Sequence, residues 1–75
     1  KPTVQREIRT TVAGMLITLK TDVFAKNILL STEGEAFFAD NYFDLLPGQT
    51  LTIYCKTEMS LAEIERQLKI RTLAN

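Results

Sequence analysis

The stretch that decides the fold is residues 41–56, NYFDLLPGQTLTIYCK. Residues 43–45, FDL, place two apolar side chains on one face of an extended chain and leave the carboxylate between them in water. Residues 46–49, LPGQ, have the chemistry of a type II turn, because Pro sets φ at the second position and Gly accepts a positive φ at the third. Residues 50–56 then alternate, so the stretch predicts a strand, a tight turn and a second strand. The side chains expected to point inward are Phe43, Leu45, Leu51, Ile53 and Cys55.

Two strands are expected before this stretch. Residues 4–11 place Val4 and Ile8 on one face with an arginine between them, which is typical of a half-exposed edge strand. Residues 15–21 alternate cleanly, and their β-forming residues favour a strand over a helix. A tight turn is expected between the two strands at Ala13-Gly14, where Gly is free to take a positive φ. Met15, Ile17 and Leu19 point to one side of the second strand, and Ile17 and Leu19 are expected in the core.

Residues 23–31 form the next expected strand, after a break at Thr21-Asp22. Its two faces both carry apolar residues, so a central strand, or one covered on both sides, is favoured. One face holds Phe24, Lys26, Ile28 and Leu30, and the other holds Ala25, Asn27 and Leu29. The pattern leaves open which of the two faces meets the core.

The remaining segments are short. Residues 33–35 are a polar turn, and residues 36–39 are a short apolar segment. Residues 60–63, SLAE, match a capping box, in which the Ser side chain and the Glu three residues later satisfy each other's free backbone donors. A helical turn or two is therefore expected over residues 61–67. Residues 68–73 alternate again and are expected to form a closing strand.

Together these elements predict an all-β, antiparallel, immunoglobulin-like β-sandwich with at most one short helix near residues 61–67. Six or so short strands with frequent turn signals are typical of a sandwich. The connections are too short for the crossovers that parallel sheets need. An α+β alternative stays open, because residues 57–64 resemble the start of a ubiquitin-like helix. A helix of three turns or more would favour that alternative.

Composition limits the size and the partners of the protein. The 75 residues, with nine basic and nine acidic side chains, suffice for a single domain. A net charge of zero argues against nucleic acid and anionic membranes as partners. The 45% hydrophobic and 24% charged fractions are those of an ordinary globular domain. The chain starts at Lys1 without Met, so we expect a piece excised from a longer protein.

The residues at 41–49, followed by alternation over 50–55, resemble the carboxyl-terminal immunoglobulin-like domain of β-mannosidases in glycoside hydrolase family 2. Residues 21–31, TDVFAKNILLS, resemble the preceding strand of those domains, and residues 68–73, LKIRTL, resemble the closing strand. The similarity covers most of the chain in order. Other sandwich domains also contain a Phe-x-Leu-x-Pro-Gly turn, so the full NYFDLLPG string is the more specific signal.

The resemblance implies one immunoglobulin-like accessory domain over residues 1–75, without catalytic residues of its own. Enzymes of that family hydrolyse terminal β-mannosides with retention, using two glutamates of a central (β/α)8 barrel that this chain does not contain. The parent would then be the enzyme, and the other domains of that glycosidase would be the partners. The compartment would be periplasmic or secreted if the parent carries a signal peptide, and cytoplasmic otherwise.

Side chains with reactive chemistry give little support to a catalytic or metal site. The chain has no His, which removes the commonest general base and metal ligand and leaves Cys55 without a partner as a nucleophile. Three carboxylate pairs have the residue types of a glycosidase: Glu33 with Glu35, Asp40 with Asp44, and Glu63 with Glu65. Solvated carboxylates are the favoured interpretation of all three. Asp40, Asn41 and Asp44 lack the dense spacing of a calcium loop, so side-chain capping or solvent exposure is favoured there. We expect no catalytic residue, cofactor or metal.

The aromatic cluster Phe37, Phe38, Tyr42 and Phe43 is the candidate contact site. Neighbouring residues of a strand point to opposite sides, so one or two of the four rings are expected to be exposed. An ordinary loop folded over its own core, a docking patch for a neighbouring domain and a sugar-stacking platform all remain open. Docking is favoured over sugar binding because Trp is absent. The alternative functions are an independent carbohydrate-binding module and a small protein-interaction domain.

Overall fold

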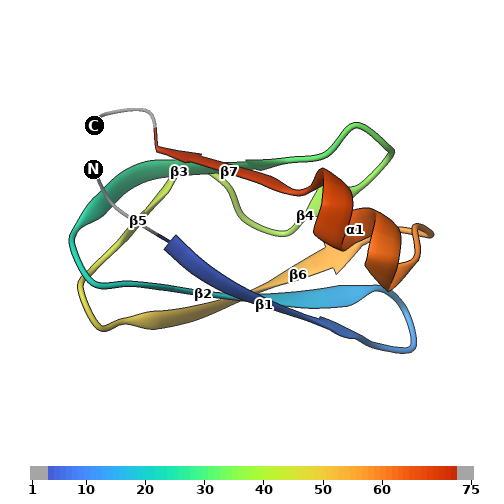
Figure 1. Cartoon of the computed structure of the whole chain (residues 1–75), viewed down its shortest axis with the longest axis horizontal. Helices are drawn as coiled ribbons and strands as arrows, with labels where there is room; N and C mark the ends of the chain where they lie inside the picture. Colours follow the sequence, from blue (N-terminus) through green and yellow to red (C-terminus); the bar gives the residue numbers. More distant parts are fainter. Residues whose placement is uncertain (1–3, 73–75) are drawn as a thin grey trace.

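The computed structural model describes residues 4–72, which form two antiparallel sheets stacked as a sandwich, with a helix at one end (Figure 1). The first sheet has the order β1 (Val4–Thr10), β2 (Met15–Thr21), β6 (Thr50–Lys56) and β4 (Phe37–Phe38). The second has the order β5 (Phe43–Leu45), β3 (Ala25–Ser31) and β7 (Lys69–Thr72), and the helix is α1 (Leu61–Gln67). The predicted sandwich is confirmed. The ubiquitin-like alternative is wrong, because α1 has seven residues, or about two turns.

The edge position of β1 is confirmed. Among the residues of β1, Ile8 is buried, and it pairs with Ile17 of β2, which in turn pairs with Ile53 of β6. Arg6 stays at the surface, where its guanidinium donates to the carbonyl oxygens of Leu68 (3.0 Å) and Glu65 (2.6 Å). These carbonyls lie at the end of α1, where the helix cannot satisfy them itself. The edge strand therefore holds the helix against the sheet.

The turn at residues 46–49 is confirmed, but it joins two sheets. Gly48 has a φ of 77°, and the Gln49 N–H donates to the Leu46 carbonyl oxygen at 3.0 Å, as the type II turn requires. The strand before it, β5, belongs to the three-stranded sheet, and the strand after it, β6, belongs to the four-stranded sheet. The Gly48 N–H also donates to the Thr21 carbonyl oxygen at 2.9 Å, which ties the turn to the end of β2.

The predicted faces of residues 23–31 are wrong, although the central position is confirmed. The strand begins at Ala25, and Phe24 lies before it at the surface. A register shift falls between Ala25 and Ile28, and Asn27 has a φ of 54°. Such a bulge adds a residue to one strand and shifts the alternation. Ala25, Ile28 and Leu30 consequently all face the core. Strict alternation had instead placed Phe24 on the same face as Ile28 and Leu30, and Ala25 on the opposite face.

The turn after β1 forms at the predicted place, but Gly14 has another role there than the one predicted. Gly48 is the glycine with positive φ among the described residues, so Gly14 does not use that freedom. Its carbonyl oxygen accepts from the Thr11 N–H at 2.7 Å, closing the loop between β1 and β2. A Cβ at Gly14 would collide with the backbone carbonyl oxygen of Cys55. Glycine is therefore needed for close packing of the loop against β6.

The core lies between the sheets and is closed at one end by α1. Of the side chains predicted to be inside, Phe43 and Leu51 are partly buried against the core. The buried ones are Ile17, Leu19, Leu45, Ile53 and Cys55. The capping box is confirmed: the Glu63 N–H donates to Ser60 Oγ at 3.2 Å, and the Ser60 N–H donates to Glu63 Oε1 at 2.9 Å. Ile64 is the side chain that α1 buries. The predicted closing strand is β7, and Leu73 lies outside the described residues.

Candidate functional site

The aromatic segment, defined as residues 37–43, crosses from one sheet to the other along an edge of the sandwich. At its start, Phe37 and Phe38 of β4 pair with Lys56 and Cys55 of β6. At its end, Phe43 of β5 pairs with β3. Figure 1 shows the connection between β4 and β5 passing between the two layers. The segment is therefore anchored at both ends by backbone pairing.

Two of the four rings in the aromatic segment are exposed, as the sequence predicted. Phe38 and Phe43 pack against the core, whereas Phe37 is 66% and Tyr42 63% accessible to solvent. Tyr42 has a φ of 58°, a left-handed conformation that costs a non-glycine residue about 1 kcal/mol or more. Its N–H donates to the Ile28 carbonyl oxygen at 2.7 Å, which holds this conformation. The fold thus maintains an unfavourable backbone geometry at an exposed ring.

Asn41 fixes the middle of the aromatic segment to the three-stranded sheet. Its Oδ1 accepts from the Leu30 N–H at 2.6 Å, and its Nδ2 donates to the Leu30 carbonyl oxygen at 3.2 Å. The Asp40 carboxylate accepts from the Asn41 N–H at 2.9 Å, and the Asp44 carboxylate accepts from the Asn27 N–H at 3.0 Å. The side chains of Asn41, Asp40 and Asp44 thus bond to backbone N–H groups, which is the side-chain capping that the sequence favoured at these positions alongside solvent exposure.

The carboxylate with the clearest structural task is Glu63. The backbone N–H of Ser60, and next its hydroxyl, hold the pKa of Glu63 below its ordinary value. A glycosidase acid needs the opposite shift, because it must be protonated when it meets the substrate. Glu63 is therefore the partner of the N-cap residue Ser60 in the capping box of α1. Glu33, Glu35, Asp40, Asp44 and Glu65 are exposed.

Cys55 is a packed core side chain. It points inward from β6, and burial raises the pKa of its thiol. The thiolate is the nucleophilic form of cysteine, so a raised pKa lowers its reactivity. Among residues 4–72, no three acidic, Cys or His side chains are grouped so that they could hold a metal ion. Nor does any helix in this part of the chain have the length and apolar character needed to cross a membrane.

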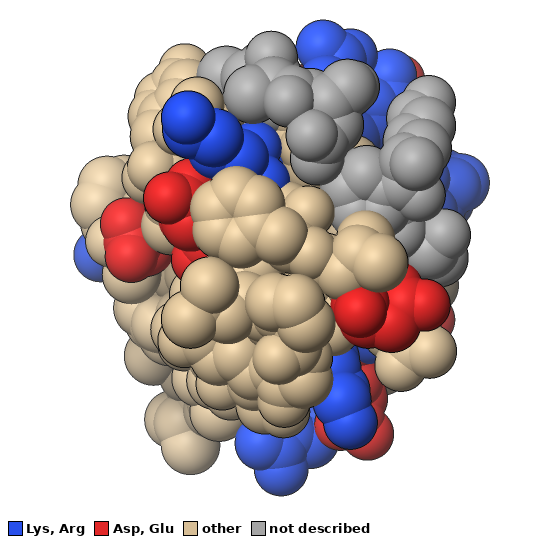
Figure 2. Space-filling model, turned by 90° about the vertical axis from the view of Figure 1, so that its left-hand side faces the viewer, with Lys and Arg blue, Asp and Glu red and all other residues tan. Residues whose placement is uncertain are grey.

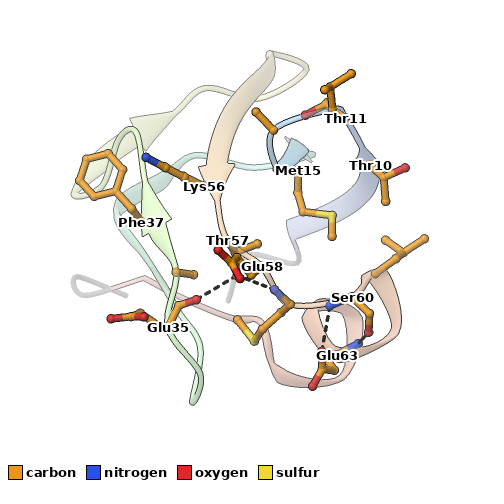
Figure 3. A pocket seen from close by; sticks show the side chains of 16 residues that line it. Thr10, Thr11, Met15, Glu35, Phe37, Lys56, Thr57, Glu58, Ser60 and Glu63 are labelled. Atoms are coloured by element: carbon orange, nitrogen blue, oxygen red, sulfur yellow. Dashed lines mark hydrogen bonds between the residues drawn. The ribbon is translucent and has the colours of Figure 1, made fainter.

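An open hollow lies beside α1, between the β1–β2 loop and the segment that leads into the helix (Figure 3). The Thr57 hydroxyl donates to the Glu35 carbonyl oxygen at 2.9 Å and accepts from the Met59 N–H at 3.1 Å. Phe37 stands at the margin of this hollow, on the side of Lys56 (Figure 3). The Thr57 hydroxyl thus holds the loop before α1.

Sequence reasoning missed a second exposed apolar area, which we name the end surface and define as Val23, Phe24 and Leu46. These side chains are 45%, 43% and 55% accessible, respectively. They come from the β2–β3 and β5–β6 turns, at the end of the sandwich that Figure 2 faces. The alternating pattern had placed Phe24 on a strand face, so this area could be found only once the bulge in β3 was known.

Comparison with protein families identifies the family of this chain. The family model of the mannosidase Ig-fold domain, Ig_mannosidase, matches residues 1–75. The resemblance stated from the sequence is thereby confirmed, and the match covers the full chain. The comparison with curated proteins finds no match.

Proposed function

This chain belongs to the Ig-fold domain family of mannosidases, and on that premise we propose that it is a non-catalytic accessory domain of a β-mannosidase-type glycoside hydrolase. In this role the domain packs on the rest of the enzyme and stabilises it. The parent hydrolyses terminal β-mannosides, and the aromatic segment is a contact with another domain of the parent.

The observation that carries this proposal is the exposure of Phe37 and Tyr42 on a segment that the fold holds rigidly. Covering an aromatic side chain completely stabilises a protein by about 1.5–3 kcal/mol. Since roughly two-thirds of each ring is still in water, most of that gain is available to a neighbouring domain. Backbone pairing and the Asn41 side chain already order the segment, so little conformational entropy is lost when it is covered.

The test is made in the intact parent enzyme. Tyr42→Ala and Phe37→Ala are each expected to remove about 1–2 kcal/mol of interdomain stabilisation and to lower the Tm by a few degrees. The matched control is Val12→Ala, which shortens an exposed apolar side chain in the β1–β2 loop. Hydrolysis of a β-mannoside by the parent at a temperature well below the Tm should be unchanged in all three variants. An unchanged Tm for both aromatic variants would count against the packing role.

A titration with manno-oligosaccharides separates this role from that of an independent carbohydrate-binding module. Amide shifts are followed by NMR in the 75-residue chain. Packing predicts an unchanged spectrum. Localised shifts around Phe38 or Tyr54 would instead favour the carbohydrate-binding alternative and contradict the proposed role.

A further inference from the structure

We propose that Met59 is a site of oxidation by peroxide, and that its sulfoxide loosens the attachment of the turn at residues 32–35 to the loop before α1. Every residue that carries this inference belongs to the described chain, so it stands independently of the proposed function. In the reaction, the O–O bond of hydrogen peroxide breaks, one oxygen atom bonds to the Met59 sulfur, and the other leaves as water. The sulfur loses two electrons and the peroxide gains them.

The chain contains two methionines, and they differ in their access to solvent. Met59 lies in the loop between β6 and α1, is partly buried against the core and lines the open hollow beside α1. Met15 also points into this hollow, but it belongs to β2 and is 4% accessible (Figure 3). A thioether reacts where the oxidant reaches its sulfur, so Met59 is the methionine expected to be oxidised first.

The Met59 side chain packs across Gly34. A Cβ added at Gly34 would lie 2.6 Å from the Met59 sulfur and 3.3 Å from its terminal methyl carbon. The first of these distances is far shorter than a van der Waals contact, so the missing side chain of Gly34 is what allows the thioether to approach. The sulfur therefore makes a close contact between the loop before α1 and the turn at residues 32–35.

The backbone donors beside this contact are already engaged. The Gly34 N–H donates to Gln67 Oε1 at 2.8 Å, and the Met59 N–H donates to the Thr57 hydroxyl at 3.1 Å. A sulfoxide oxygen is a polar acceptor, and burying it without a donor is unfavourable. The oxygen is consequently expected to turn toward water in the hollow, which removes the Met59 side chain from its contact with Gly34.

The loosened contact lies next to the start of the aromatic segment. The Thr57 hydroxyl donates to the Glu35 carbonyl oxygen at 2.9 Å, and Glu35 lies two residues before Phe37. Because β4 has two residues, its pairing with β6 depends on how firmly the turn leading into it is held. Oxidation of Met59 is therefore expected to open β4 more often, while the longer strands of the same sheet stay paired.

The experiment treats the folded 75-residue chain with dilute hydrogen peroxide and locates the added oxygen by mass spectrometry. Trypsin cleaves after Lys and Arg, which places the three sulfur atoms of the chain in separate peptides, residues 10–20, 27–56 and 57–66. We expect Met59 to be oxidised roughly tenfold faster than Met15, since Met15 reacts only when its strand opens. Cys55, in peptide 27–56, is expected to stay unmodified because it is buried.

The effect on stability is measured on the same samples. Oxidation of the wild type is expected to lower the Tm by about 4–8 °C, and methionine sulfoxide reductases should restore it. Met59→Leu keeps nearly the same side-chain volume without a sulfur atom, so peroxide should leave its Tm unchanged. Met15→Leu is the matched control, and peroxide should lower its Tm as in the wild type. Hydrogen exchange should become faster over residues 34–38 of the oxidised chain and stay slow in β2.

Each of three results would overturn the proposal. Peroxide might lower the Tm of Met59→Leu as much as that of the wild type, which would make another residue responsible. Met59 sulfoxide with an unchanged Tm and unchanged exchange would show that this contact does not hold the turn. Oxidation of Met15 before Met59 would contradict the difference in access. The docking role of the aromatic segment is tested separately, by Tyr42→Ala and Phe37→Ala in the parent enzyme.

Discussion

Replacing Asn41 by Ala is expected to be among the most damaging polar substitutions in this protein. β5 pairs with β3 through Leu45 and Phe43, which lie opposite Ala25 and Ile28. Leu30 lies two residues beyond Ile28 and pairs with Ile70 of β7 on its other side, but on the β5 side no strand residue among those described lies opposite it. The Asn41 side chain takes that place instead and satisfies both the N–H and the carbonyl oxygen of Leu30. The carboxamide thereby extends the hydrogen-bond ladder by one step.

The magnitude follows from these two bonds. Leu30 is 2% accessible, so water cannot readily replace the lost partner. A buried backbone group left without a partner costs about 1–3 kcal/mol, and Asn41→Ala strands two such groups, one of them only weakly bonded at 3.2 Å. We expect a loss of about 2–4 kcal/mol, against a total stability of about 4–11 kcal/mol for a domain of 75 residues.

Urea denaturation of the 75-residue chain, followed by circular dichroism, measures this loss. Asn41→Asp keeps the acceptor for the Leu30 N–H but sets a carboxylate oxygen against the Leu30 carbonyl oxygen, so this variant too should be less stable than the wild type. Asp40→Ala is the matched control, since it removes a neighbouring hydrogen bond at the surface and is expected to cost less than about 1 kcal/mol. A loss for Asn41→Ala no larger than that for Asp40→Ala would refute the reasoning.

Three further predictions concern the close packing, the helix cap and the thiol. Gly14→Ala is expected to lower the free energy of unfolding in urea by about 1–3 kcal/mol, because the added Cβ collides with a backbone carbonyl. Gly34→Ala is expected to lower it by less, because its Cβ meets the movable end of a methionine side chain. Equal losses for the two variants would contradict this reasoning. The Ser60 N–H keeps the pKa of Glu63 below its ordinary value of about 4.5, so the cap stabilises the fold above that pH and this contribution is lost as the pH falls through the folded pKa. Glu63→Gln should therefore show a shallower fall in urea midpoint between neutral and acidic pH, and an identical fall would argue against the cap. The Cys55 thiol, whose pKa burial raises, should react with an aromatic disulfide reagent on the order of a hundredfold more slowly than in urea-unfolded chain, and equal rates would contradict its burial.

The strands, the type II turn and the helix cap were predictable because each depends on neighbouring residues. Alternation over residues 15–21 and 50–56 needs no knowledge of the partner strand, since a buried face requires every second side chain to be apolar. The same holds for the turn at Pro47-Gly48 and for the hydrogen bonds between Ser60 and Glu63, which lie three residues apart. The family resemblance rested on the same local strings.

The exposed pair of the aromatic segment was predictable only in part. Because neighbouring residues of a strand point to opposite sides, one or two of its four rings were expected to be exposed, but this argument did not identify which. Phe37 and Tyr42 are the exposed ones because β4 pairs with β6 and Asn41 reaches Leu30, eleven residues back in the chain. Those contacts turn the other two rings toward the core.

Local chemistry thus determined that this chain forms short antiparallel strands with one capped helix. Contacts between distant residues decided what it presents to a neighbour. Asn27 is held in its bulge by Asp44, seventeen residues away, and that bulge leaves Phe24 outside the core. Gly48 reaches Thr21 and joins two turns into the end surface. Such hydrogen bonds leave no periodic trace in a sequence, because their partners meet only after both sheets have formed.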